Sequence, residues 1–183
     1  MDLAYKIAQV CFIIAYALLA MTYKLRSRKQ ILVISLASLV AFAAAYAFSE
    51  AWSGLAMMGV ALIRNVTFIL QNKRDKSKKI TKIDWIILVV LLLIALVFAI
   101  FTYDGWLSLL PVMATMIYTV SVWQKNTRVY RLLGIPTSLL LLGYHIFIRS
   151  IFGIILECVL FIAVMVGVVT EKKTNRKKRK IKS

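Results

Sequence analysis

The stretch from Ile86 to Phe101 reads IILVVLLLIALVFAIF and contains no charged side chain, no polar side chain and no glycine. With its flanks, from Ile83 to Tyr103, it is long enough to cross a hydrocarbon core of roughly 30 Å, which takes about 20 helical residues. Because a bilayer offers no water to backbone N–H and C=O groups, this stretch is expected to be a transmembrane α-helix.

Apolar stretches of similar length lie on both sides of this one, so the sequence predicts an all-α integral membrane protein with seven transmembrane helices. The others run from Leu3 to Tyr23, Gln30 to Phe48, Ala51 to Gln71, Asp104 to Trp123, Leu132 to Arg149 and Ser150 to Thr170. No separate soluble domain is expected. The first stretch follows Asp2 and lacks a basic leader, so we interpret it as a retained helix and not as a signal peptide.

Basic residues occur on alternate sides of these stretches. All but three of the 24 Lys and Arg residues lie in three connections and the C-terminal tail. They are Lys24, Arg26, Arg28 and Lys29; Lys73, Arg74, Lys76, Lys78, Lys79 and Lys82; Lys125, Arg128 and Arg131; and Lys172, Lys173, Arg176, Lys177, Lys178, Arg179, Lys180 and Lys182. The alternate connections carry Glu50, Asp104 and Arg149. Since positively charged loops stay in the cytosol, we expect the N-terminus outside and the C-terminus in the cytoplasm.

The formal net charge of +17 would suggest a nucleic-acid partner for a soluble protein. Here the charge lies beside membrane spans, so we expect the lipid bilayer, with anionic lipids at the basic loops and tail, as the partner, and no nucleic acid. The tail from Lys172 to Ser183 is expected to be too polar to fold and to lie on the inner leaflet. Each tryptophan lies at the end of a predicted helix and is expected in the headgroup layer: Trp52, Trp85, Trp106 and Trp123.

The two halves of the chain resemble each other when shifted by about 100 residues. Ala15-Tyr16 aligns with Ile117-Tyr118, Arg28 with Arg128, Ala45-Tyr46 with Gly143-Tyr144, and Trp52-Ser53-Gly54 with Ile151-Phe152-Gly153. This predicts a three-helix repeat over residues 1–71, a cytoplasmic loop and linker helix over 72–103, a second three-helix repeat over 104–170 and a basic tail over 171–183. The repeats are expected to be parallel, a 3+1+3 arrangement like that of SWEET transporters.

Several short motifs resemble the YgjV family of bacterial inner-membrane proteins. They are Ile7-Ala8-Gln9 with Ala15; Ala61-Leu62-Ile63-Arg64-Asn65; Leu109-Leu110-Pro111-Val112 with Thr115 and Thr119; Tyr144-His145; and Ser150-Ile151-Phe152-Gly153 with Glu157. The resemblance covers nearly the whole chain up to the basic tail. It implies a multi-pass protein of the bacterial inner membrane, distantly similar to the SWEET and PQ-loop group.

The chain departs from that wider group in two ways. It has no Pro-Gln pair, and its prolines, Pro111 and Pro136, both lie in the second half, whereas the sugar transporters carry matching prolines in both halves. The departure argues against a sugar-type rocking mechanism. A proline within a helix frees backbone carbonyls, so Pro111 and Pro136 are expected to border a cavity or to act as hinges.

Two charged side chains, Arg64 and Glu157, lie well inside predicted spans and not near their ends. Arg64 is about 13 residues, or roughly 20 Å, from the outer end of its helix, where an unpaired guanidinium costs several kcal/mol. It is either buried with a functional or structural role, or it extends to the cytosolic surface. Glu157 is the only carboxylate well inside a span, roughly 10 Å deep. Direct contact between these counter-charges is left open, because a water or a bound solute can bridge them.

Two further polar residues complete the candidate site. His145 is expected close to Glu157 in depth, where a shared hydrogen bond would suit proton coupling or pH sensing. Alternatively, it faces the lipid headgroups. Asn65 follows Arg64, and SWEET-like proteins often place an Asn on this helix in the solute pocket. An intramembrane Asn also serves as a link between helices.

The sequence contains no nucleophile beside a base, no phosphate-binding loop and no metal-ligand spacing, so we expect neither an enzyme nor a metal or cofactor. The polar residues have apolar counterparts in the other repeat, which fits one asymmetric site better than a channel. We predict a carrier or binder of a small polar solute, with a pocket between the two three-helix bundles lined by Arg64, Asn65, His145 and Glu157. The alternative is a non-transporting receptor or assembly protein of the same fold.

Overall fold

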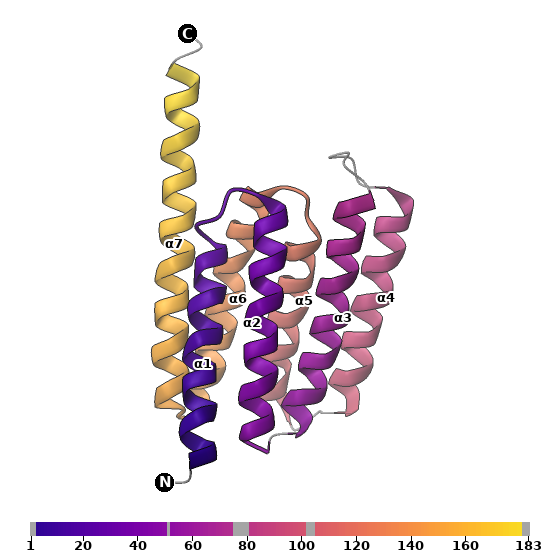
Figure 1. Ribbon diagram of the computed structural model, residues 1–183, viewed down its shortest axis with the longest axis vertical. Helices are drawn as coiled ribbons and strands as arrows, with labels where there is room; N and C mark the ends of the chain where they lie inside the picture. Colours follow the sequence, from indigo (N-terminus) through magenta and orange to yellow (C-terminus); the bar gives the residue numbers. More distant parts are fainter. Residues whose placement is uncertain (1–2, 51, 75–80, 102–104, 181–183) are drawn as a thin grey trace.

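The computed structural model describes residues 3–50, 52–74, 81–101 and 105–180, without the side chains at 52–54, 56, 73–74 and 172–180. This part of the chain is entirely helical apart from short connections (Figure 1). Its elements are α1 (Leu3–Thr22), α2 (Arg28–Phe48), α3 (Trp52–Arg74), α4 (Lys82–Phe101), the short 3₁₀ helix η1 (Trp106–Ser108), α5 (Leu109–Trp123), α6 (Thr127–Phe147) and α7 (Ile151–Lys180).

The helices run alternately in opposite directions, so their connections gather at two ends of one bundle (Figure 1). We call the basic end the one at which α1, α3, α5 and α7 finish. The described basic segments from Lys24 to Lys29 and from Lys125 to Arg131 both lie there. Predictions for Lys76, Lys78, Lys79, Asp104 and residues 181–183 lie outside the described residues, as do those for the side chains of Trp52, Lys73, Arg74 and Lys172 to Lys180.

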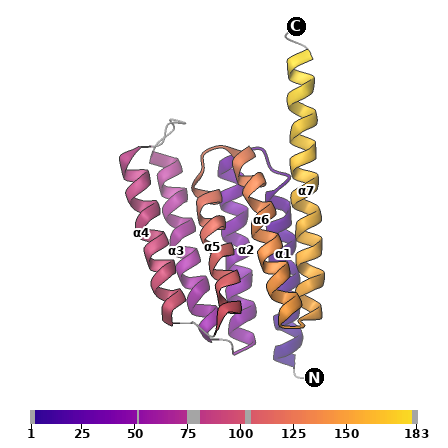
Figure 2. The same cartoon turned by 180° about the vertical axis from the view of Figure 1, so that it is seen from behind.

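The bundle consists of two rows of three helices and one additional helix. In one row α1 packs against α2 and α2 against α3, and in the other α5 packs against α6 and α6 against α7. The rows meet where α1 contacts α7 and where α3 contacts α5. The helix α4 lies at one edge of the bundle, as the views from both sides show (Figures 1 and 2), and its contacts are mainly with α5.

The helix α4 buries a single stripe of side chains, at Asp84, Leu88, Leu91, Ala95 and Ala99. Positions three or four residues apart lie on the same face of an α-helix, so this stripe is the face that α4 turns toward its neighbours α5 and α3. The rest of its surface is apolar and largely exposed. An exposed apolar surface of this kind is suited to contact with lipid.

Among the described residues, six helices are long and apolar enough to cross a membrane. They are α1, α2, α4, η1 together with α5, α6, and α7 as far as Glu171. The helix α3 is not among these six, because its side chains at 52–54, 56 and 73–74 lie outside the described residues. It nevertheless runs alongside the others (Figure 1), and its status as a seventh span stays a prediction.

The prediction that the tail is too polar to fold is wrong as far as Lys180. The helix α7 continues without interruption over 30 residues and projects beyond the bundle at the basic end (Figure 1). Once a helix is nucleated, each added residue gains a hydrogen bond at small cost, and Lys and Arg are favourable helix formers. A polar composition therefore does not end this helix.

Trp123 ends α5, as predicted for a residue at the end of a span, but its side chain packs inside the protein. Its side chain is 3% exposed, and its indole Nε1 donates a hydrogen bond of 3.0 Å to the carbonyl oxygen of Asp84. Its ring centre lies 4.8 Å from that of Trp85. Trp85 and Trp106 are exposed, as expected for interfacial residues. Trp123 instead links the end of α5 to the start of α4.

Two arginines join the rows at the basic end through reciprocal contacts. Arg28, at the start of α2, donates a hydrogen bond of 3.0 Å to the carbonyl oxygen of Trp123 at the end of α5. Arg131, in the first turns of α6, donates one of 2.6 Å to the carbonyl oxygen of Leu25, just after α1. Carbonyls at helix C-termini lack helical partners, so each arginine satisfies a group of the opposite row. The sequence had indicated both residues only as determinants of orientation.

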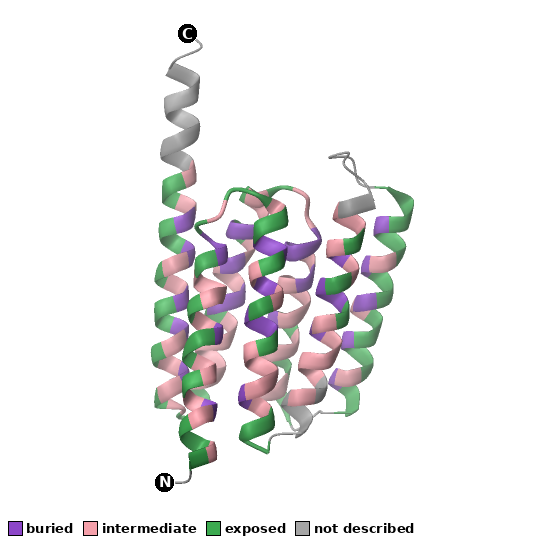
Figure 3. Cartoon of the chain, in the orientation of Figure 1, coloured by how far each residue is buried: buried purple, intermediate pink, exposed green. Residues whose placement is uncertain are grey.

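Burial is deepest toward the basic end (Figure 3). In α6 all the buried residues lie in the first part of the helix, from Tyr130 to Ser138, and in α5 most lie from Thr119 to Trp123. The same helices are only partly buried toward the opposite end. The two rows are thus closed against each other at the basic end and packed more loosely at the other.

Candidate functional site

Arg64 is buried within the bundle and does not extend to the surface. It is 5% exposed, and its Nη1 donates a hydrogen bond of 2.8 Å to the hydroxyl oxygen of Thr119 on α5. Its guanidinium carbon lies 5.1 Å from the centre of the Tyr118 ring, which is cation–π geometry. The helix α3 thus carries its cation against α5, across the boundary between the two rows.

Arg64 has no acidic partner among the described residues. The ion pairs there join Lys125 to Asp84 and Arg131 to Glu171, and the Nε of Arg64 is buried without any hydrogen-bond partner. Burying a cation without a counter-charge costs several kcal/mol. The hydroxyl group of Thr119 and the ring of Tyr118 compensate for only part of that cost. The guanidinium can therefore still bind an anion.

Asn65 lies beside Arg64 but faces α2. Its Nδ2 is 3.2 Å from the hydroxyl oxygen of Ser35 and 3.4 Å from the carbonyl oxygen of Leu32, while its Oδ1 is buried without a partner. The Ser35 hydroxyl lies 3.0 Å from that of Tyr118, so the two residues share a hydrogen bond. One polar cluster therefore connects α2, α3 and α5 and includes two unused polar atoms.

Glu157 belongs to a second cluster, between α7 and α1. It is 1% exposed, and its Oε1 accepts a hydrogen bond of 2.9 Å from the hydroxyl of Tyr16. Its Oε2 is buried without a partner. No hydrogen bond or ion pair connects Glu157 to Arg64 in the described structure, so the candidate residues form two clusters and not one.

His145 lies on α6, against the first turn of α7. Its ring occupies the space beside Gly153, where a β-carbon would overlap it. The Nδ1 atom is buried without a partner, and the hydrogen bonds of the described residues include none between His145 and Glu157. Gly153 and Glu157 are four residues apart and share a face of α7, so His145 lies about one turn from the carboxyl group.

The comparison with known families concerns most of the chain and not the individual clusters. A family model described as a bacterial inner membrane protein, Imp-YgjV, matches residues 6–175. The chain belongs to the YgjV family. No curated protein and no solved structure matched the chain. The family confirms the predicted resemblance and places this multi-pass protein in the bacterial inner membrane, with the lipid bilayer around its helices.

The two prolines of this YgjV-family protein occupy different environments. Pro136 lies inside α6, so the carbonyl of Leu132 loses its usual helical partner. Pro111 is the third residue of α5, where a backbone N–H has no intrahelical acceptor and a proline costs no hydrogen bond. The structure thus places only Pro136 at a weakened point of a helix, and the hinge role of either proline stays a prediction.

Sequence reasoning missed the partners of both charges. Tyr16 and Tyr118 were recognised as paired repeat positions but were interpreted as packing residues. In the structure Tyr16 on α1 contacts the acidic group of α7, and Tyr118 on α5 contacts the cation of α3. The repeat alignment was the signal that could have identified them. Tyrosines that the repeat alignment pairs therefore contact opposite charges in the two halves of the chain.

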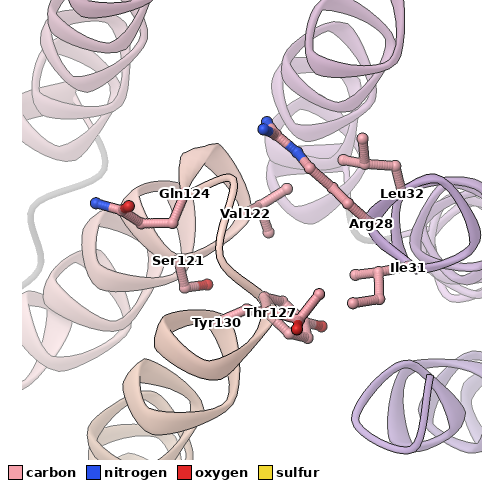
Figure 4. Close-up of a pocket in the computed structure, with 8 residues that line it drawn as sticks. All are labelled: Arg28, Ile31, Leu32, Ser121, Val122, Gln124, Thr127 and Tyr130. Atoms are coloured by element: carbon pink, nitrogen blue, oxygen red, sulfur yellow. The ribbon is translucent and has the colours of Figure 1, made fainter. Parts of the chain in front are cut away.

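A small cavity lies at the basic end and shares Leu32 with the surroundings of Asn65 (Figure 4). Its volume is about 10 Å³, close to the least that holds one water molecule. It is lined from α2, from α5 and the residue after it, and from α6, by Arg28, Ile31, Leu32, Ser121, Val122, Gln124, Thr127 and Tyr130. It is too small for an organic solute, so we do not place the solute site there. No group of three or more potential metal ligands occurs in the described part of the chain.

Proposed function

We propose that this YgjV-family protein is a carrier or binder, not an enzyme, of a small polar solute with an anionic group. The observation that carries the proposal is the buried guanidinium of Arg64, which has an unused Nε and no acidic partner among the described residues. A planar guanidinium pairs with a carboxylate or phosphate through two parallel hydrogen bonds. Such an anion would complete the site.

Neighbouring groups support a polar ligand. The unused Oδ1 of Asn65 is an acceptor that suits a hydroxyl or ammonium group on the same solute. The cluster joins α3 to α5 and α2 to α5, so a ligand bound there touches both rows. A carrier needs a site that two moving parts share, and this arrangement meets that condition.

We further propose the 3+1+3 arrangement, with α1 to α3 and α5 to α7 as parallel repeats. Both α2 and α6 contain 21 residues, and the second residue after each has a positive φ, 54° at Glu50 and 55° at Arg149. Non-glycine residues rarely adopt this conformation, so its recurrence supports a common origin. Arg28 of α2 contacts the end of α5 and Arg131 of α6 contacts the segment after α1, so the same pairs of helices are linked in both directions, although from different positions of α2 and α6.

Orientation is part of the proposal. The basic end is expected in the cytosol, against anionic headgroups, with the N-terminus outside. Because the rows are closed at the basic end and looser at the other, this conformation would admit the solute from the outside. A cysteine introduced at Glu50 should react with a membrane-impermeant thiol reagent added outside intact cells, whereas reaction only after lysis contradicts the orientation.

Replacing Arg64 by methionine tests the function. The substitution removes a buried unpaired charge, so stability without solute is expected to change by less than about 1 kcal/mol. The probes are inorganic phosphate, small carboxylates and amino acids, each added to detergent-purified protein during thermal unfolding. A probe present at about 100 times its Kd stabilises the native state by about 2.7 kcal/mol. We expect this increase in Tm in the wild type and its loss in Arg64→Met.

Arg64→Lys is the matched control, because it keeps the charge but not the planar pair of donors, and it should retain part of the increase. If none of these probes raises the Tm of the wild type, or if the increase persists in Arg64→Met, the proposal is wrong. The non-transporting receptor or assembly protein would then be the better interpretation. If Arg64→Met fails to fold, Arg64 is a structural link between the rows and not a ligand-binding residue.

A further inference from the structure

Glu157 is an acidic group in an environment that does not favour its charge. The helix α7 packs against α6 and α1. The titratable side chains brought toward the carboxyl group are His145 on α6, Tyr16 on α1 and Tyr23 directly after α1. Arg131, the buried cation of α6, pairs with Glu171 at the basic end. Glu157 therefore has no ion-pair partner within the described structure.

The energies favour a neutral carboxyl group. An ionised carboxylate transferred from water to a protein interior loses several kcal/mol of solvation. A hydrogen bond from one hydroxyl group to a charged acceptor offsets only part of that loss. Oε1 already accepts the hydrogen bond from Tyr16, and Oε2 has no partner. The vacant position on Oε2 is where a proton would be carried.

We propose that Glu157 is a proton-binding site, with the proton on Oε2 in the conformation described and released when the carboxyl group gains contact with water. Tyr16 keeps its own proton and donates to Oε1 in both states. His145 lies about one turn nearer the end at which α7 begins, and its unpaired Nδ1 can accept the proton on its way out.

This site deepens the proposed function, because a proton on Glu157 and an anion on Arg64 would move together without net charge. An uncompensated charge would instead have to cross the membrane potential. Only this coupling rests on the proposed function. Protonation of Glu157 requires no solute and is tested without one.

The test uses a membrane-soluble carbodiimide, which modifies protonated carboxyl groups in an apolar environment. The full-length protein in liposomes is treated from about pH 5 to about pH 9, and labelled peptides are identified by mass spectrometry. We expect labelling at Glu157 that falls by more than about tenfold over this range. Glu157→Gln should lose it. The exposed Glu50 is the control carboxyl group, which should react with a water-soluble carbodiimide instead.

Tyr16→Phe provides an independent readout. Tyr16 stabilises the ionised carboxylate, so its loss should keep Glu157 protonated and extend labelling to higher pH. The proposal is wrong if Glu157 stays unlabelled at acidic pH in folded protein, or if Tyr16→Phe leaves the pH profile unchanged. A protein that binds none of the solute probes should still be labelled at Glu157. The proposed solute site at Arg64 and the proposed proton site at Glu157 can therefore be disproved independently.

Discussion

Replacing Arg131 by methionine should lower the free energy of unfolding by about 3 kcal/mol, because it leaves a carboxylate and a backbone carbonyl without their partner. Arg131 is 5% exposed and bonds to Glu171 at 2.8 Å and to the carbonyl oxygen of Leu25 at 2.6 Å. The Glu171 side chain is 18% exposed, so water compensates for part of the loss. Unfolding of the purified protein with increasing denaturing detergent measures the change.

Arg128→Met is the matched control. Arg128 lies one turn earlier on the same helix, carries the same charge and is exposed, so its loss should change stability by less than about 0.5 kcal/mol. The double variant Arg131→Met, Glu171→Gln should recover part of the stability, because no unpaired carboxylate then remains. Equal stability of Arg131→Met and Arg128→Met would show that this connection between the rows contributes little.

Gly167→Ala should destabilise the protein by about 2 kcal/mol through overpacking. A β-carbon at Gly167 would lie 2.5 Å from the carbonyl oxygen of Tyr23, so α7 would have to move away from the end of α1. Tyr23 cannot move freely, because its ring stacks on Tyr130 with centres 5.0 Å apart and also fills the space beside Gly134. The midpoint of thermal unfolding in detergent should fall accordingly.

Gly143→Ala tests whether contact, and not helix propensity, causes that loss. Gly143 lies within α6, and a β-carbon there meets nothing within 4 Å. Alanine is favoured over glycine within a helix by up to about 1 kcal/mol, so this variant should be neutral or more stable. If both alanine variants have the same stability, the close approach of α7 to α1 is not tight enough to matter.

The contacts of Arg131 and Gly167 also explain why the bundle is closed at one end. Arg131 holds the end of α1, and Gly167 lets α7 approach the same turn. Together with the contact of Arg28 to α5, they make the basic end the point at which the rows are fixed. In a carrier that alternates its access, these are contacts that inward opening would have to break.

The sequence indicated much of the candidate site but not its geometry. Arg64 and Glu157 stand out in sequence because charges within apolar spans are costly. The sequence does not show which side of α3 packs against its neighbours, and so it left open whether Arg64 is buried or extends to the surface. In the structure the side of α3 that carries Arg64 packs against α5. The separation of Arg64 from Glu157 likewise depended on how the rows align, which no local pattern contains.

The apolar stretches and the alternating charges alone determined a helical, multi-pass membrane protein with its basic connections at one end. The free energy of transferring a segment into lipid is a property of that segment and can be read residue by residue. Only the tertiary structure decided that Trp123 and Arg131 are buried, that Glu157 pairs with Tyr16, and that α7 continues into the tail. Those outcomes depend on contacts between residues distant in sequence, or on a helix already formed, and neither is visible in composition.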